Sequence, residues 1–336
     1  MWDGMEWMGH PDQRMQVHSF RLTGGREEGL ECIEVQAGSG LSFTVALGHA
    51  MSLQAARYKG INLSYLPAGG SSGPGMTWQL ERYFEGGLMF TCGLDSTGQA
   101  NGPYGLHGML RRLPAQEVTV SRYMRDGSHE VEIRGRVIQS GLGASTLILE
   151  RSIRCADEKA EIRIHDRIYN ASGAPAGWMI MYHFNMGWPL LGPGARLHIP
   201  SISVRPKNEI AQKIADTYLE ITEPMAEWQP QVFFHSLDPR AETARIVLEN
   251  PEAGVGAAIV TVPSQLPCLT QWRNFRQGEY VLGLEPCNVF PMGRTWTEEK
   301  KLLPVLGPGE EVTLDLAFQV WDIKKQEPAA GEENHG

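Results

Sequence analysis

A histidine and an asparagine lie two positions apart inside an otherwise apolar segment. Residues 178–191 read WMIMYHFNMGWPLL, with His183 and Asn185 near the middle. Because burying an unpaired polar side chain costs about 1–3 kcal/mol, both residues need hydrogen-bonding partners or a chemical role. Side chains alternate along a strand, so both should share a face with Met179 and Met181. We expect this face to line a pocket and the opposite, aromatic-rich face to pack in the core.

Two further segments place an ionisable side chain in a similar setting. Residues 103–108, PYGLHG, hold His107 in a turn between glycines, and residues 279–288, EYVLGLEPCN, end an apolar strand with Glu285. Gly283 shares a strand face with Glu285 and is expected to leave room for a ligand. Two histidines and a carboxylate in apolar surroundings are suited to acid–base catalysis near neutral pH.

The elements that must position these residues are mainly strands. In residues 160–169, AEIRIHDRIY, isoleucines alternate with charged residues, which is typical of a half-buried antiparallel strand. The same reasoning predicts strands at 117–124, 129–139, 145–155, 178–185, 256–262, 279–285 and 311–321. Turn sequences such as GPG separate them, and helices are expected only at 52–59 and 208–218. The predicted fold is all-β, a large antiparallel β-sandwich with a ligand on a concave sheet face.

Length and composition restrict the class of protein. No internal repeat or long linker divides the 336 residues, which predicts one domain over residues 1–336, with a core at about 30–322 and flexible termini. The net charge of −9, with dispersed Lys and Arg, argues against nucleic-acid binding. No apolar stretch is long enough for a membrane span, and residues 1–15 do not resemble a signal peptide. Five scattered cysteines without a CxxC motif favour a cytoplasmic protein and no structural zinc site.

Several motifs together resemble one family. GLHG, YHFNMGWPLL and GLEPCN occur in this order, and residues 55–70 and 86–98, the latter preceded by Arg82, add two more matching segments. In this combination the chain resembles the aldose 1-epimerase (galactose mutarotase) superfamily, in particular its bacterial branch of uncharacterised aldose-epimerase-like proteins. The resemblance covers roughly residues 30–320.

The resemblance implies a galactose mutarotase-like sandwich that binds a sugar in a cleft on one sheet. It also implies a reaction without metal or cofactor, in which the α and β anomers of an aldose or modified aldose interconvert through ring opening and closure. By position, Glu285 matches the general base, His183 the general acid, and His107 a second histidine that holds the sugar. We expect the carboxylate and an imidazolium on opposite sides of the ring.

Other residues are candidates for substrate binding. Arg82 and Asn185 are expected to contact sugar oxygens, and Trp188 or Trp272 could stack against the sugar. Arg273 is expected to point into the cleft. His49 stands where relatives carry arginine, and it either changes specificity or is structural. Either Asp95 or Asp238 could be the aspartate that contacts sugar hydroxyls in mutarotases.

Two other functions fit the same residues. His107, His183 and Glu285 also match a two-histidine, one-carboxylate metal site of a sugar isomerase, although the closely spaced His-x-His motif of such enzymes is absent. A sugar-binding or sensor protein without catalysis is the second alternative, but binding alone does not require a matched acid and base. The sequence does not specify the sugar, a charged substituent on it, or whether the protein is a monomer or a homodimer.

Overall fold

The computed structural model describes residues 7–73, 84, 86–125 and 127–324. The predicted sugar-contacting Arg82 lies outside these residues. None of the described helices has the length and apolar character needed to cross a membrane.

Strands dominate the structure. The strands are β1 (Gln16–Arg21), β2 (Glu31–Gln36), β3 (Leu41–Ala46), β4 (Ser52–Tyr58), β5 (Ile61–Asn62), β6 (Met89–Leu94), β7 (Gln116–Arg125), β8 (Ser128–Gln139), β9 (Leu147–Ala156), β10 (Glu161–Asn170), β11 (Ala176–Gly177), β12 (Met179–Met186), β13 (Arg196–His198), β14 (Ser201–Pro206), β15 (Gln231–Leu237), β16 (Ala244–Asn250), β17 (Val255–Thr261), β18 (Cys268–Arg276), β19 (Glu279–Cys287), β20 (Val305–Leu306) and β21 (Glu311–Asp322). The helices are α1 (Glu209–Gln212), α2 (Arg294–Glu299) and the 3-10 turns η2 (Pro11–Gln13), η3 (Gly25–Glu27), η4 (Leu47–His49) and η5 (Leu110–Arg112).

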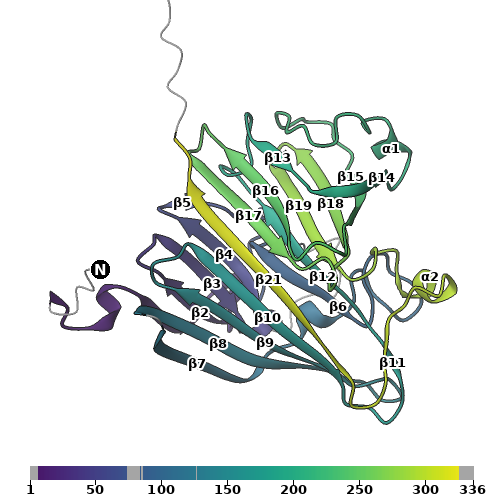
Figure 1. The fold of residues 1–336 in the computed structure, drawn as a ribbon, viewed down its shortest axis with the longest axis horizontal. Helices are drawn as coiled ribbons and strands as arrows, with labels where there is room; N and C mark the ends of the chain where they lie inside the picture. Colours follow the sequence, from purple (N-terminus) through teal and green to yellow (C-terminus); the bar gives the residue numbers. More distant parts are fainter. Residues whose placement is uncertain (1–6, 74–83, 85, 126, 325–336) are drawn as a thin grey trace, which may run out of the picture.

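Two large antiparallel sheets form the sandwich that the alternation predicts. An 11-stranded sheet has the order β1-β2-β3-β4-β6-β12-β19-β18-β15-β14, with β5 paired to β4. An 8-stranded sheet has the order β13-β16-β17-β21-β10-β9-β8-β7 and lies over the first in Figure 1. The apolar faces of both meet in one hydrophobic core, where Phe184 of β12 stacks on Phe318 of β21 with ring centroids 5.9 Å apart.

Strand β12 has the two faces that its sequence predicts. Ile180, Tyr182 and Phe184 belong to the main core between the sheets. Met181, from the opposite face, packs in a smaller apolar cluster with Phe90, Cys92 and Cys287. The histidine face of β12 therefore points away from the 8-stranded sheet.

A buried polar network joins the two sheets behind this strand. Arg151 of β9 binds Asp166 of β10 through Nε–Oδ1 and Nη2–Oδ2 contacts of 2.8 and 2.6 Å. Asp166 also accepts a 2.6 Å hydrogen bond from the Tyr182 hydroxyl on β12, and Arg151 donates to Thr91 on β6 at 2.9 Å. Since both charged side chains are fully buried, this network fixes the sheets relative to each other beneath the histidine strand.

The predicted helices are largely wrong. Residues 52–58 form β4, which pairs with β3, because sheet pairing overrides the helix propensity of its Ala, Gln and Arg residues. In the 208–218 segment only Glu209–Gln212 is α-helical, and Asn208 caps this turn by accepting from the Ala211 N–H.

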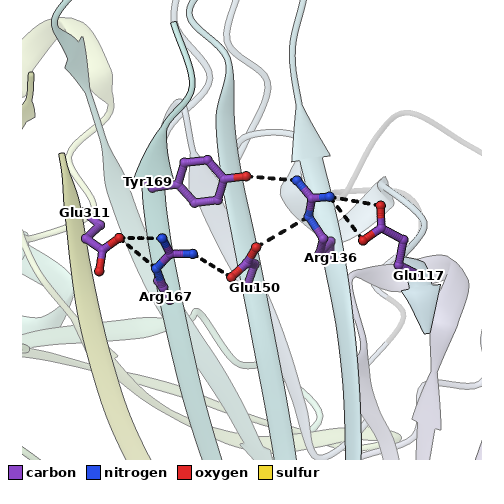
Figure 2. Close-up of polar contacts among 6 residues, drawn as sticks. All are labelled: Glu117, Arg136, Glu150, Arg167, Tyr169 and Glu311. Carbon is purple, nitrogen blue, oxygen red and sulfur yellow. Dashed lines mark hydrogen bonds and ion pairs between the residues drawn. The ribbon is translucent and has the colours of Figure 1, made fainter. Parts of the chain in front are cut away.

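The outer face of the 8-stranded sheet carries a ladder of alternating charges. Figure 2 shows Glu117, Arg136, Glu150, Arg167 and Glu311 following one another across β7, β8, β9, β10 and β21. Arg167 bridges its two glutamates at 2.7 and 2.5 Å. Opposite charges on neighbouring strands are favourable in a solvated face, so this surface is explained by exposure to water.

Candidate active site

A cleft of about 610 Å³ opens on the 11-stranded sheet. Its floor is formed by side chains of β12, β19, β18 and β15, which are consecutive in the sheet order. The ionisable and aromatic side chains central to its chemistry are His107, His183, Lys207, Trp272 and Glu285. The structure thus brings together the two histidines and the glutamate from segments that are far apart in the sequence.

His183 and Glu285 touch each other on adjacent strands. Strands β12 and β19 pair in a register that places Met181 opposite Cys287 and Asn185 opposite Gly283, which sets His183 beside Glu285. The Nε2 atom of His183 lies 3.1 Å from Oε1 of Glu285. The two residues are only 4% and 2% exposed, so this contact is shielded from water.

Burial shifts the pKa values of this pair in opposite directions. Burial raises the pKa of Glu285 to about 8, and the Lys207 ammonium opposes the rise. Burial also holds the pKa of His183 well below its usual range, assisted by His107. At neutral pH the pair therefore holds one proton, on the Glu285 carboxyl, within 3.1 Å of Nε2 of His183. This protonation state differs from the expected combination of a carboxylate and an imidazolium. The 3.1 Å contact also differs from the expected placement of the two groups on opposite sides of a sugar ring.

His107 reaches the same cleft from a loop. Its backbone φ is 61°, and Gly108 follows it, where an added Cβ would lie 2.4 Å from the Ser96 carbonyl oxygen. The Gly98 N–H donates to Nδ1 of His107 at 3.2 Å, so the neutral ring carries its proton on Nε2. Burial, with help from Arg111 and Lys207, lowers the pKa of His107 to about 3. His107 is therefore an uncharged hydrogen-bond donor to the cleft.

Aromatic rings hold the His183 imidazole in place. Phe90 stacks on it with centroids 4.5 Å apart and an angle of 19°. Phe84 and Trp272 approach it edge-on at 5.8 and 5.7 Å. Trp272 also lines the cleft, as expected for a residue that stacks against a sugar.

Gly283 makes room for the glutamate and not for a ligand. A Cβ on Gly283 would lie 2.6 Å from Oε1 of Glu285 and 3.1 Å from the Trp272 side chain. Gly283 itself does not line the cleft. The expectation of a ligand close to Gly283 was wrong because the Glu285 carboxyl folds back over it.

A family model described as a domain of unknown function, DUF4432, matches residues 27–320. The chain belongs to this family. No curated protein matches the chain.

Solved structures confirm the resemblance to the aldose 1-epimerase superfamily. A Klebsiella pneumoniae protein, provisionally described as an aldose 1-epimerase, is 26% identical with a TM-score of 0.86 over 92% of this chain and 84% of its own. A galactose mutarotase-like protein from Clostridium acetobutylicum is 11% identical, with a TM-score of 0.65 over 93% and 100% of the two chains. An Escherichia coli protein with the same provisional description as the first is 13% identical, with a TM-score of 0.61 over 92% and 100%.

In this DUF4432 chain, Asn185 lies beneath the cleft and not in it. It is fully buried, and its amide donates to the carbonyl oxygens of Gly87 at 3.2 Å and His183 at 3.1 Å. The predicted contact with sugar oxygens is therefore wrong, because these bonds turn the amide toward the β12 backbone. Asn185 instead holds the main chain around His183.

Three other candidates also lie outside the cleft. Trp188 is 70% exposed, and its carbonyl, not its ring, is engaged, by Asn62. Arg273 follows Trp272 on β18 and so points to the opposite face, where it donates to Gln231 at 3.0 Å and to the Glu220 carbonyl at 2.6 Å. His49 is buried at the end of η4, away from the cleft lining.

Neither candidate aspartate lines the cleft. Asp95 accepts from the Ser96 N–H in a turn, and Asp238 is paired with Arg240 at 2.9 Å. Within the described part of the chain, no group of three His, Cys, Asp or Glu side chains is arranged to hold a metal ion.

Sequence reasoning missed Lys207 and Thr270, which both line the cleft. Thr270 lies directly opposite Glu285 in the β18–β19 register. Lys207 directly follows β14, and its N–H donates to the Val232 carbonyl at 2.9 Å. In the sequence, a lysine directly after a strand resembles an ordinary surface residue. Only the pairing of Lys207 with Val232 on the neighbouring strand β15 would have indicated its place in the cleft.

Proposed function

We propose that this protein is an aldose 1-epimerase that interconverts the α and β anomers of an aldose or modified aldose. The observation that carries the proposal is the buried 3.1 Å contact between His183 and Glu285 in a cleft of about 610 Å³. Anomer exchange requires removal of the proton from the C1 hydroxyl and addition of a proton to the ring oxygen. Both oxygens are bonded to C1, so an acid and a base in mutual contact can reach both at once.

The single proton held by the pair is sufficient for both ring closure and ring opening. The uncharged pair, with its proton on Glu285, matches the state in which ring closure begins: the carboxyl donates to the C1 oxygen while the imidazole accepts the proton from the C5 hydroxyl. For ring opening, the shared proton first moves across the 3.1 Å contact to Nε2 of His183. Glu285 then acts as base and His183 as acid, each contributing about 10²–10⁴-fold.

Neighbouring residues would hold the sugar during C1–C2 rotation. The Nε2–H of His107 would donate to a sugar oxygen, and Trp272, which lines the cleft, would stack against the apolar side of a pyranose. The similarity to proteins named as aldose 1-epimerases and galactose mutarotase-like proteins supports a sugar as substrate. We also propose that residues 30–322 act as one domain and that the protein works in the cytoplasm without a cofactor.

Exchange spectroscopy tests this function directly. Saturation-transfer NMR on equilibrated glucose, galactose and a wider panel of aldoses, with and without protein, measures anomer exchange above the spontaneous rate. Acceleration on at least one sugar is the expected result. Binding of a sugar without acceleration would contradict the proposal and favour a sugar-binding or sensor protein.

A further inference from the structure

Lys207 presents an uncompensated positive charge to the cleft. It is half-buried, and its ammonium group makes no hydrogen bond or ion pair with residues 7–73, 84, 86–125 and 127–324. Its electrostatic partner is Glu285, and burial lowers the pKa of the lysine while Glu285 opposes this shift. Because the Glu285 carboxyl is itself protonated at neutral pH, it gives Lys207 little countercharge.

The other charged side chains of the cleft do not correct this imbalance. Arg276 and Glu279 form an ion pair at 3.7 Å and cancel each other. Arg26 also lines the cleft, and its guanidinium donates to the Gly69 carbonyl at 2.9 Å. With both cleft histidines uncharged, none of these lining residues supplies a countercharge to Lys207, in a chain whose net charge is −9.

We propose that the substrate is an aldose with an anionic substituent, a phosphate or a carboxylate, and that Lys207 binds this group. The inference rests on the proposed epimerase function. A neutral sugar that covered Lys207 would remove water from an ammonium and supply no opposite charge, which is unfavourable. An anionic substituent supplies that charge and forms charge-assisted hydrogen bonds, which are about twice as strong as neutral ones.

The test compares matched sugars in both binding and turnover. Glucose, glucose 6-phosphate and glucuronate present the same anomeric centre with no anion, a phosphate or a carboxylate. Calorimetry with the Glu285→Gln variant measures binding without turnover, and exchange NMR with the wild type measures kcat/KM. We expect a preference of about 10- to 100-fold for one of the two anionic sugars over glucose. The preferred sugar identifies the anionic substituent as a phosphate or a carboxylate.

Variants then assign the preference to Lys207. In Lys207→Met the ratio of kcat/KM for the anionic sugar to that for glucose should fall by about tenfold or more, and Lys207→Arg should retain most of it. Lys159→Met is the matched control because Lys159 is exposed on the β9–β10 loop of the other sheet and loses the same charge. The control should leave the ratio unchanged.

Two results would overturn the inference while leaving the proposed function intact. One is equal binding and turnover of glucose and both anionic sugars. The other is an equal loss for all three sugars in Lys207→Met with a displaced pH profile, which would mean that Lys207 acts only through Glu285. Conversely, an anionic preference in binding without turnover of any sugar would support the binding role of Lys207 and contradict the epimerase function.

Discussion

The Nε2 atom of His183 lies 3.1 Å from the Oε1 atom of Glu285, and both side chains are almost completely buried. A buried polar group on either strand alone is costly, and the pairing of β12 with β19 brings the two groups into contact. Because the pKa of Glu285 is raised and the pKa of His183 is lowered, the pair carries a single proton at neutral pH.

Replacing Glu285 by glutamine should remove catalysis and preserve the fold. The amide has nearly the same shape but cannot accept a proton, so kcat should fall by about 10²–10⁴-fold. Exchange NMR measures the rate, and calorimetry checks that sugar binding survives. Glu299→Gln on α2, where the side chain is exposed, is the matched control. Turnover near the wild-type rate in Glu285→Gln would show that another group is the base.

The reaction should slow as the pH rises through about 8. Above the pKa of about 8, Glu285 loses the only proton of the pair, and no proton remains for the ring oxygen. We expect kcat/KM to fall by about tenfold per pH unit there. Below neutral pH the profile should stay flat, because the pKa of His183 lies well below its usual range and a second proton does not bind.

The measurement is kcat/KM between pH 6 and 9.5 after subtraction of the spontaneous rate. A rate that rises to a plateau above pH 8 would contradict the one-proton state and indicate that the free enzyme must carry an ionised glutamate.

A methyl group at position 283 should displace the Glu285 carboxyl. The Cβ of Gly283→Ala would lie 2.6 Å from Oε1 of Glu285, so the carboxyl must move away from His183. We expect kcat to fall by about 10²-fold, since small displacements of reacting groups have effects of this size. The variant Gly173→Ala, where nothing lies within 4 Å of the added Cβ, controls for the substitution. Normal rates in both variants would mean that the contact with His183 is not required.

Sequence reasoning could identify much of the site because its ionisable residues interrupt apolar strands. His183 and Glu285 stand out for this reason, and the sandwich follows from the alternation in strands such as β10. Side-chain direction was harder to predict. Trp272 and Arg273 are neighbours on β18, and only the register with β19 decides that the tryptophan faces the cleft. Lys207 has no local signal at all, because its role depends on which strand ends meet in the folded sheet.

The buried ion pair of the 8-stranded sheet, between Arg151 and Asp166, should matter far more to stability than the surface ladder. Asp166→Ala would leave Arg151 fully buried without its partner, which costs about 3–5 kcal/mol. Glu311→Ala removes one exposed member of the ladder in Figure 2 and should change the free energy of unfolding little, because water and salt screen such pairs. Urea unfolding followed by tryptophan fluorescence measures both. Similar small losses in the two variants would mean that Arg151 finds another partner, and that the hydrogen bonds from Tyr182 to Asp166 and from Arg151 to Thr91 do not fix the sheets beneath His183 as the structure indicates.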